Sequence, residues 1–326
     1  MFIWDNGLRL VKGDVAIDFT RRQPCGFVSH AHSDHLARHE MILCTPETAA
    51  LCEYRLKGKG RKPSFQEMPY FQPLSWGGLK LTTYPAGHIL GSAMLHAVDE
   101  ETGQSLLYTG DFKLGPSATS REAVPVYADT LIMESTFGTP QHRLPPREET
   151  IQKFLHEIRH TFQQGRTPVV YAYTLGKSQE ITKILTGEGM PVRQHTLMYK
   201  ISRIYGEHGV DLGDVVEWKE GIIGKDRVLL VPPHIGIFET ETEPVTFAVT
   251  GWAAENGAKY RLGVDHAFPI SDHADYDDLI RMVELVGPKI VYCTHGPDSF
   301  VDRLCDLGFN AKPLDKPWQG WLNYEG

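Results

Sequence analysis

The amino-acid sequence predicts an α/β fold with two structural parts. Short runs of apolar and β-branched residues dominate the first part, and they end in turns rich in glycine and aspartate. From residue 148 onward, segments with helical spacing alternate with short apolar runs, which is typical of a sheet covered by helices. The chain of 326 residues also exceeds the usual length of one domain. We therefore expect two domains, or one domain with a large insertion.

The first part is predicted to open with a hairpin and to continue as strands. Residues 8–11 and 15–19 flank the turn pair Gly13-Asp14. One short helix is expected at residues 48–54. Residues 25–29 form a short apolar run that precedes a histidine cluster. Four further strands are predicted at residues 79–84, 93–98, 105–109 and 130–133.

The second part is predicted to alternate helices and strands. Its first helix covers residues 148–163, where apolar residues recur at helical spacing from Ile151 to Phe162. The remaining predicted strands are residues 168–173, 228–231, 245–249 and 290–294. The remaining predicted helices are residues 178–185, 277–286 and 299–307.

Composition and charge exclude several classes of protein. The formal net charge is −8, so a basic field over the whole surface is absent and any nucleic-acid site must be local. The five cysteines form no C-x-x-C pair, which favours a reducing compartment. The sequence contains no run of about 18 apolar residues and no leader with a basic and then an apolar region. We expect a soluble cytoplasmic protein without a membrane segment.

A histidine cluster follows the predicted strand at residues 25–29. Its sequence is His30-Ala31-His32-Ser33-Asp34-His35. Alternate residues of an extended segment point the same way, so His30 and His32 can bind one metal. The turn that follows can direct Asp34 and His35 toward a second. Imidazole and carboxylate ligands suit zinc, and less often manganese or iron.

Three further candidate ligands stand beside glycine. Asp111 and His295 each come directly after a predicted strand, and His88 lies in a turn with glycines close on both sides. Taken singly, each is more often an ordinary turn residue. Because the histidine cluster is also present, we predict that all three are metal ligands. A rigid metal site needs side chains held by strand ends and tight turns.

The ordered set His30, His32, Asp34, His35, His88 and Asp111 resembles the dinuclear zinc motif of the metallo-β-lactamase fold. Downstream, residues 134–138, 271–275 and 294–296 resemble motifs A, B and C of the β-CASP nuclease branch. Within that branch, the chain is most similar to bacterial exonucleases described as DNA-ligase-associated. The resemblance implies a metallo-β-lactamase αββα sandwich from residues 1–142 and 268–326, interrupted by an α/β β-CASP insertion at residues 143–267.

The resemblance also implies a role for each residue. His30, His32 and His88 would bind one zinc ion, Asp34, His35 and His295 the other, and Asp111 would bridge both. Asp18 would orient ligands from behind, His273 would act as general acid, and Glu134 would hydrogen-bond His273. The implied cofactor is a pair of Zn²⁺ ions, with Mn²⁺ as the alternative metal.

Such a site can hydrolyse phosphodiesters without a serine or cysteine nucleophile. Two metals about 3.5–4 Å apart lower the pKa of a bridging water and neutralise a phosphate oxygen. Asp111 would hold both metals and accept a hydrogen bond from the resulting hydroxide. His273 would protonate the leaving oxygen, and Glu134 would raise its pKa by opposite charge.

The segment Gly176-Lys177-Ser178 is similar to the end of a P-loop, but Tyr171 stands where that motif needs glycine. Two interpretations stay open. In one, these residues begin an ordinary helix; in the other, the helix start and Lys177 contact a phosphate of bound nucleic acid. We slightly favour the phosphate contact, because β-CASP proteins carry a similar segment.

The favoured function is a zinc-dependent nuclease, most specifically a DNA exonuclease in DNA repair, functionally associated with a DNA ligase and a helicase. The expected partner is nucleic acid, DNA ahead of RNA, and no membrane. His295 favours the alternative of RNA processing, because histidine at motif C is associated with RNA-processing members of the branch. A hydrolase of small esters is disfavoured by the insertion, and a catalytically inactive scaffold is disfavoured by the intact ligand set.

Overall fold

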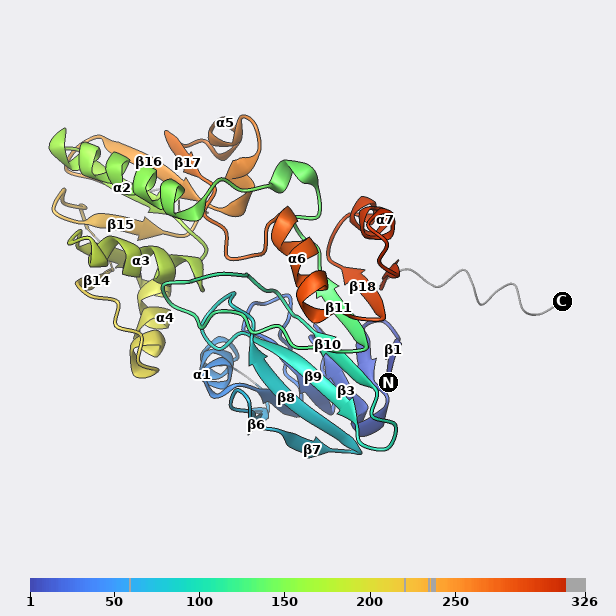
Figure 1. The fold of residues 1–326 in the computed structure, drawn as a ribbon. Helices are drawn as coiled ribbons and strands as arrows, with labels where there is room; N and C mark the ends of the chain where they lie inside the picture. Colours follow the sequence, from blue (N-terminus) through green and yellow to red (C-terminus); the bar gives the residue numbers. More distant parts are fainter. Residues whose placement is uncertain (59, 220, 234, 236–238, 315–326) are drawn as a thin grey trace.

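The described part of the chain contains three sheets, two of which stack face to face (Figure 1). The computed structural model describes residues 1–314 apart from residues 59, 220, 234 and 236–238. The mixed α/β architecture predicted from the sequence is confirmed. None of the helices in this described part is long and apolar enough to cross a membrane.

The first stacked sheet has six strands, of which β1 to β3 are antiparallel and β3 to β6 parallel. Its strands are β1 (Phe2–Trp4), β2 (Leu8–Leu10), β3 (Val15–Ile17), β4 (Cys25–Phe27), β5 (Met41–Cys44) and β6 (Ser64–Glu67). The predicted hairpin is confirmed: β2 pairs with β3, and Gly13 adopts a φ of 76° in the turn between them. Glycine takes this left-handed conformation without steric cost.

The second stacked sheet has seven strands in the order β19-β18-β11-β10-β9-β8-β7. These are β19 (Ala311–Pro313), β18 (Ile290–Thr294), β11 (Thr130–Glu134), β10 (Ser105–Tyr108), β9 (Ala93–Asp99), β8 (Leu79–Pro85) and β7 (Leu74–Trp76). Leu10, Phe27, Leu95 and Leu106 belong to one buried cluster between the two sheets. This cluster is the core that holds them together.

Helices cover the outer faces of the stacked sheets. α1 (Pro46–Arg55) packs on the first sheet, and the side chain of Thr45 caps its first turn. α6 (Tyr276–Val286) and α7 (Asp298–Asp306) pack on the second sheet. Asp275 caps α6 by accepting a hydrogen bond from the Asp278 amide, which fixes the chain immediately after residues 271–274.

The third sheet is wholly parallel and has six strands in the order β14-β13-β15-β12-β16-β17. These are β14 (Val215–Trp218), β13 (Val192–His195), β15 (Val228–Val231), β12 (Thr167–Tyr171), β16 (Pro244–Val249) and β17 (His266–Phe268). α2 (Arg147–Gln163) and α3 (Lys177–Gly187) pack on one face of it. Short α5 (Ala258–Leu262) lies beside the edge strand β17.

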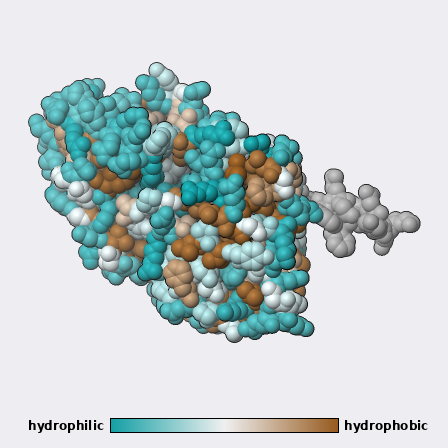
Figure 2. Space-filling view, viewed as in Figure 1, coloured by the Kyte–Doolittle hydropathy of each residue, from teal (hydrophilic) through white to brown (hydrophobic). Residues whose placement is uncertain are grey.

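The third sheet and its helices lie to one side of the stacked sheets in Figure 1. α4 (Thr196–Glu207) joins the two parts: Ile201 and Tyr205 share a buried cluster with Leu51 of α1 and Ile89. Figure 2 shows a surface that is mostly hydrophilic on the face in view, with hydrophobic side chains in separate patches. The docking of the two parts therefore buries apolar side chains directly beside His88.

Candidate metal centre

Three imidazoles converge beyond the end of β4. The Nε2 atom of His30 lies 3.0 Å from Nδ1 of His32, and Nε2 of His88 lies 3.1 Å from the same Nδ1 atom. A carboxylate oxygen of Asp111 lies 3.4 Å from Nε2 of His30. One potential ligand atom from each of these four residues lies within 4.8 Å of the others. The sequence motif and the two later turns thus form one pocket of donor atoms.

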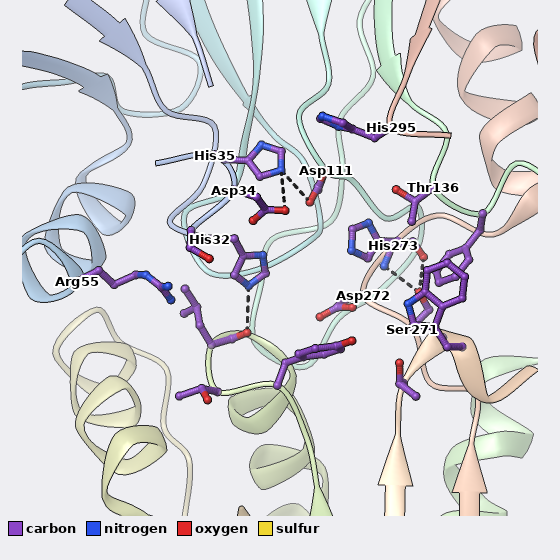
Figure 3. A pocket seen from close by; sticks show the side chains of 18 residues that line it. His32, Asp34, His35, Arg55, Asp111, Thr136, Ser271, Asp272, His273 and His295 are labelled. Atoms are coloured by element: carbon purple, nitrogen blue, oxygen red, sulfur yellow. Dashed lines mark hydrogen bonds and ion pairs between the residues drawn. The ribbon is translucent and has the colours of Figure 1, made fainter. Parts of the chain in front are cut away.

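A second group of donor atoms shares Asp111. Nε2 of His35 lies 3.4 Å from the Asp111 carboxylate and 3.8 Å from that of Asp34. His295 joins His35 and Asp111 within 4.8 Å, and it adopts a left-handed φ of 58° directly after β18. Asp34 is exposed at the rim (Figure 3). All seven predicted ligands therefore lie in one region, in two groups joined by Asp111.

The carboxylate of Asp18 supports the histidine cluster at residues 30–35 through hydrogen bonds. Its carboxylate accepts hydrogen bonds from Nδ1 of His35 (2.8 Å), the hydroxyl of Tyr108 (2.8 Å) and both the amide (2.7 Å) and hydroxyl (2.5 Å) of Ser29. The Ser29 hydroxyl oxygen also lies 3.0 Å from Nδ1 of His30. Such contacts fix the ring orientation of metal-binding histidines.

Two backbone carbonyls determine the tautomers of His32 and His88. Nε2 of His32 donates to the carbonyl of Leu175 (3.2 Å), and Nδ1 of His88 donates to the carbonyl of Asp272 (2.8 Å). A carbonyl can only accept, so each of these nitrogens carries a hydrogen. In the neutral ring the other nitrogen then presents a lone pair to the cluster. The part built on the third sheet thus supports His32 through Leu175, and the segment after β17 supports His88 through Asp272.

The electrostatics favour the ligand form of the same rings. Burial lowers the pKa of His30, His32 and His88, and neighbouring imidazoles lower it further; for His32 it falls to about 4. Burial opposes charge on Asp111 too, but the imidazoles around it hold its pKa well below the usual range. Neutral imidazoles beside an ionised carboxylate are the donor set that zinc binds, so His30, His32, His88 and Asp111 fit a zinc ion. Burial opposes charge on His35, but Asp111 and Asp18 raise the pKa of that imidazole well above its usual range, so a metal bound there would have to displace its proton.

His273 and Glu134 form a separate pair at the same site. Nδ1 of His273 lies 2.9 and 3.1 Å from the two carboxylate oxygens of Glu134. Glu134 also accepts hydrogen bonds from the Phe112 amide and the Thr136 hydroxyl. Burial lowers the pKa of His273, but the negative charges of Glu134 and Asp111 outweigh it and raise the pKa to about 10. This imidazole is therefore held in its protonated form.

These groups line a cavity of about 480 Å³, which we call the central cavity (Figure 3). It lies between the stacked sheets and the third sheet. His32, Asp34, His35, Asp111, His273 and His295 line it from the stacked sheets. Arg55, Thr136, Tyr173, Thr250 and Trp252 also line it. Thr136 lies in the motif A segment but has no predicted role. Arg55, Tyr173, Thr250 and Trp252 were not predictable from the sequence, because they stand in none of the motifs described above and come together only when the two parts dock.

The expected phosphate contact of Lys177 is wrong. This side chain is fully buried, and its Nζ atom lies 3.5 Å from Asp272 and 3.6 Å from Glu180. Two amides at the helix start are already paired as well. The Gly176 amide donates to the side chain of Gln179, and the Ser178 amide donates to the carbonyl of Tyr173. The segment instead places the Leu175 carbonyl against His32.

Known proteins resemble this chain over different lengths. Residues 263–312 match the Zn-dependent metallo-hydrolase RNA specificity domain. A "Probable DNA ligase" of Opitutus terrae is 37% identical over 321 residues, which is 94% of this chain and 31% of that protein. An "RNase J-like protein" of Methanocaldococcus jannaschii is 32% identical over 179 residues, covering 48% of this chain and 42% of that protein. The chain therefore spans less than half of each of these relatives.

A solved structure gives the fold alone. The crystal structure of a protein of unknown function from Enterococcus faecalis is 15% identical, with a TM-score of 0.58 over 83% of this chain and 75% of that chain. The sheets and the matching domain fit a metallo-β-lactamase-type α/β fold. Together with the relatives, they show that the chain belongs to the metallo-β-lactamase superfamily and, within it, to the β-CASP family.

Proposed function

We propose that the protein is a zinc-dependent nuclease that hydrolyses phosphodiester bonds. The observation that carries this proposal is the pair of donor groups joined by Asp111, with the protonated His273 in the same cavity. His30, His32 and His88 would hold one ion, and Asp34, His35 and His295 the other. Zinc ions held there would lower the pKa of a water molecule and neutralise charge on a phosphate oxygen.

The protein's own residues would position the substrate and supply a proton. Glu134 occupies the Nδ1 side of His273, which leaves Nε2 to protonate the leaving oxygen. Arg55 lines the opposite part of the central cavity and would attract the phosphate backbone (Figure 3). Asp18, Leu175 and Asp272 would keep the ligand rings in place, through the hydrogen bonds described above.

We further propose that DNA ends are the substrate, in a repair reaction coupled to ligation. The match to a protein named "Probable DNA ligase" extends over 94% of this chain, but over only a third of that protein. The protein named "Probable DNA ligase" therefore contains a segment similar to this chain together with further sequence. The five unpaired cysteines suit the reducing cytoplasm, where such a reaction would take place.

RNA processing is the second candidate function. The matching domain is described as an RNA specificity domain, and a shorter match is named RNase J-like. His295 also favours this candidate, since the resemblance to the β-CASP branch implies that histidine at the motif C position goes with RNA processing. Both candidates use the same central cavity and differ only in the polymer bound.

We propose the domain limits on the same basis. Residues 143–267 would form the β-CASP insertion, and residues 1–142 and 268–326 the sandwich, of which residues 315–326 lie outside the described part. The parallel third sheet and its helices, from α2 to β17, support this division.

The proposed function is tested with end-labelled single- and double-stranded DNA and RNA, each with and without a 5′-phosphate, at matched zinc concentrations. We expect DNA to be degraded from an end, and His32→Ala to abolish cleavage. Degradation of RNA alone would replace the DNA assignment with RNA processing. Absence of cleavage of every polymer by zinc-loaded protein would overturn the nuclease assignment.

A further inference from the structure

A second cavity opens at the carboxyl edge of the third sheet. It has a volume of about 470 Å³ and is lined by residues at or beyond the ends of β12, β15 and β16. β13 to β15 lie on one side of β12, whereas β16 and β17 lie on the other, so the chain changes direction at this point. In open parallel sheets, ligands bind in the crevice outside the strand ends at such a switch point. We call this space the side cavity.

The side cavity adjoins the central cavity. Tyr173, Thr250 and Trp252 line both. Tyr173 and Trp252 are 52% and 39% exposed, so their rings are available at the shared rim. The ring of Trp252 packs edge-on against Phe137 at 4.9 Å and His142 at 5.4 Å, which fixes its orientation. A ligand can therefore contact both cavities across a rim of preformed aromatic surface.

The lining of the side cavity suits a flat, uncharged group. Ala248, Val249 and Val264 provide apolar walls. At its polar end, Arg261 and Glu255 form an ion pair of 2.6 Å, so the positive charge of the arginine is already compensated. Among the lining residues that the structure describes, a phosphate would find no net positive charge. A heterocycle can stack on the aromatic rim and hydrogen-bond to either member of the ion pair.

We propose that the side cavity is a nucleobase subsite. It would bind one base of a single-stranded nucleic acid whose neighbouring phosphate lies in the central cavity, so this inference rests on the proposed function. Trp252 would be the stacking residue, with Tyr173 beside it. Stacking on an aromatic ring tolerates any base, because every base has a π-face. The subsite would therefore favour an unpaired strand without reading its sequence.

The test is an abasic scan of a single-stranded oligonucleotide. Binding is measured by fluorescence anisotropy on chelator-treated protein, for the intact oligonucleotide and for versions that lack one base at successive positions. We expect one position to weaken binding to the natural protein by about 5- to 150-fold. In Trp252→Ala, binding of the intact oligonucleotide should weaken, and loss of that base should add little further penalty.

Two control variants keep the test decisive. Tyr260→Ala removes an aromatic residue of α5 that is 79% exposed and does not line the cavity, so this variant should show the full penalty for loss of the base. Trp252→Phe keeps an aromatic ring and should retain most of the penalty, which excludes misfolding as the cause. An equal penalty in Trp252→Ala and the natural protein, or no position with a penalty, would overturn the subsite.

Zinc is then restored and cleavage of the same oligonucleotides is measured. Cleavage without a base-dependent penalty would overturn the subsite and leave the nuclease assignment intact. A base-dependent penalty without cleavage would leave the subsite intact and overturn the nuclease assignment. No binding of any oligonucleotide would overturn the subsite.

Discussion

At the scale of single residues, His273 differs from the candidate ligands His32 and His88 in its partner. Glu134 contacts its Nδ1 atom with both carboxylate oxygens, whereas His32 and His88 face backbone carbonyls. A carboxylate stabilises the imidazolium form, while a carbonyl selects a neutral tautomer. The same side chain thus serves as an acid in one place and as a candidate ligand in the other.

His273→Ala should slow cleavage by about 10²–10⁴-fold, the usual contribution of a general acid. It should leave the bound zinc unchanged, because the seven predicted ligands remain. The measurements are the cleavage rate and the zinc content per chain. The donor atoms of His273 also lie within 4.8 Å of those of Asp111 and Glu134, so loss of a zinc ion would instead identify His273 as a ligand.

Glu134→Gln should shift the pH dependence of cleavage. The acid works only when protonated, and the pKa of His273 is about 10, so cleavage should fall as the pH rises through about 10. Removing the carboxylate charge takes away the largest interaction that raises the pKa of His273, so the fall should occur at lower pH. The measurement is kcat/KM against pH on one DNA substrate. The exposed Glu243→Gln is the control, and an unchanged profile in Glu134→Gln would contradict the pairing.

The same pair links stability to pH. The pKa of His273 in the folded protein lies above its unfolded value near 6.5, so the pairing with Glu134 stabilises the fold fully below pH 6.5. That contribution should be lost as the pH rises toward about 10.

At the scale of elements, a buried charge network connects α3 to the centre. Lys177 lies between Asp272 and Glu180, and Arg147 of α2 donates to Glu180 (2.6 Å) and to the carbonyl of Ser271 (2.7 Å). Asp272 in turn holds His88 through its carbonyl. The first turn of α3 is therefore fastened to the segment that carries His273.

Lys177→Ala should lower the free energy of unfolding by about 3–5 kcal/mol, because it leaves two buried carboxylates with less positive charge. The exposed Lys153→Ala on α2 should change it by no more than about 0.5 kcal/mol. Urea unfolding measures both. If Lys177→Ala kept its stability and weakened only nucleic-acid binding, with a shallower dependence on salt, Lys177 would be a phosphate contact after all.

The positions of the candidate ligands could be predicted from the sequence, because each follows a strand or a tight turn within a short motif. The hairpin at Gly13 and the helices α1, α2, α6 and α7 were predictable for a similar local reason, since turn residues and apolar periodicity mark them. The carbonyls of Leu175 and Asp272 were not predictable, because every residue has a carbonyl. The burial of Lys177 was not predictable either, since it depends on the docking of α3 against residues about ninety positions later.

At the scale of the whole molecule, neither part forms the central cavity alone. The stacked sheets supply the candidate ligands, while the third sheet supplies Tyr173, Leu175 and Trp252. A polymer can lie along such a boundary, whereas a small ester needs only a closed pocket. The side cavity extends the same boundary away from the candidate ligands. The arrangement therefore suits both the proposed hydrolysis at the metal centre and a long polymeric substrate.

The central claim is that two zinc ions act together in cleavage of nucleic acid. The most direct test is a zinc titration of chelator-treated protein, with the rate of cleavage of end-labelled DNA and RNA measured at each ratio of zinc to chain. We expect the rate to rise until two equivalents are bound and then to stay constant. A rate that reaches its plateau at one equivalent, or that does not depend on added zinc, would contradict the account.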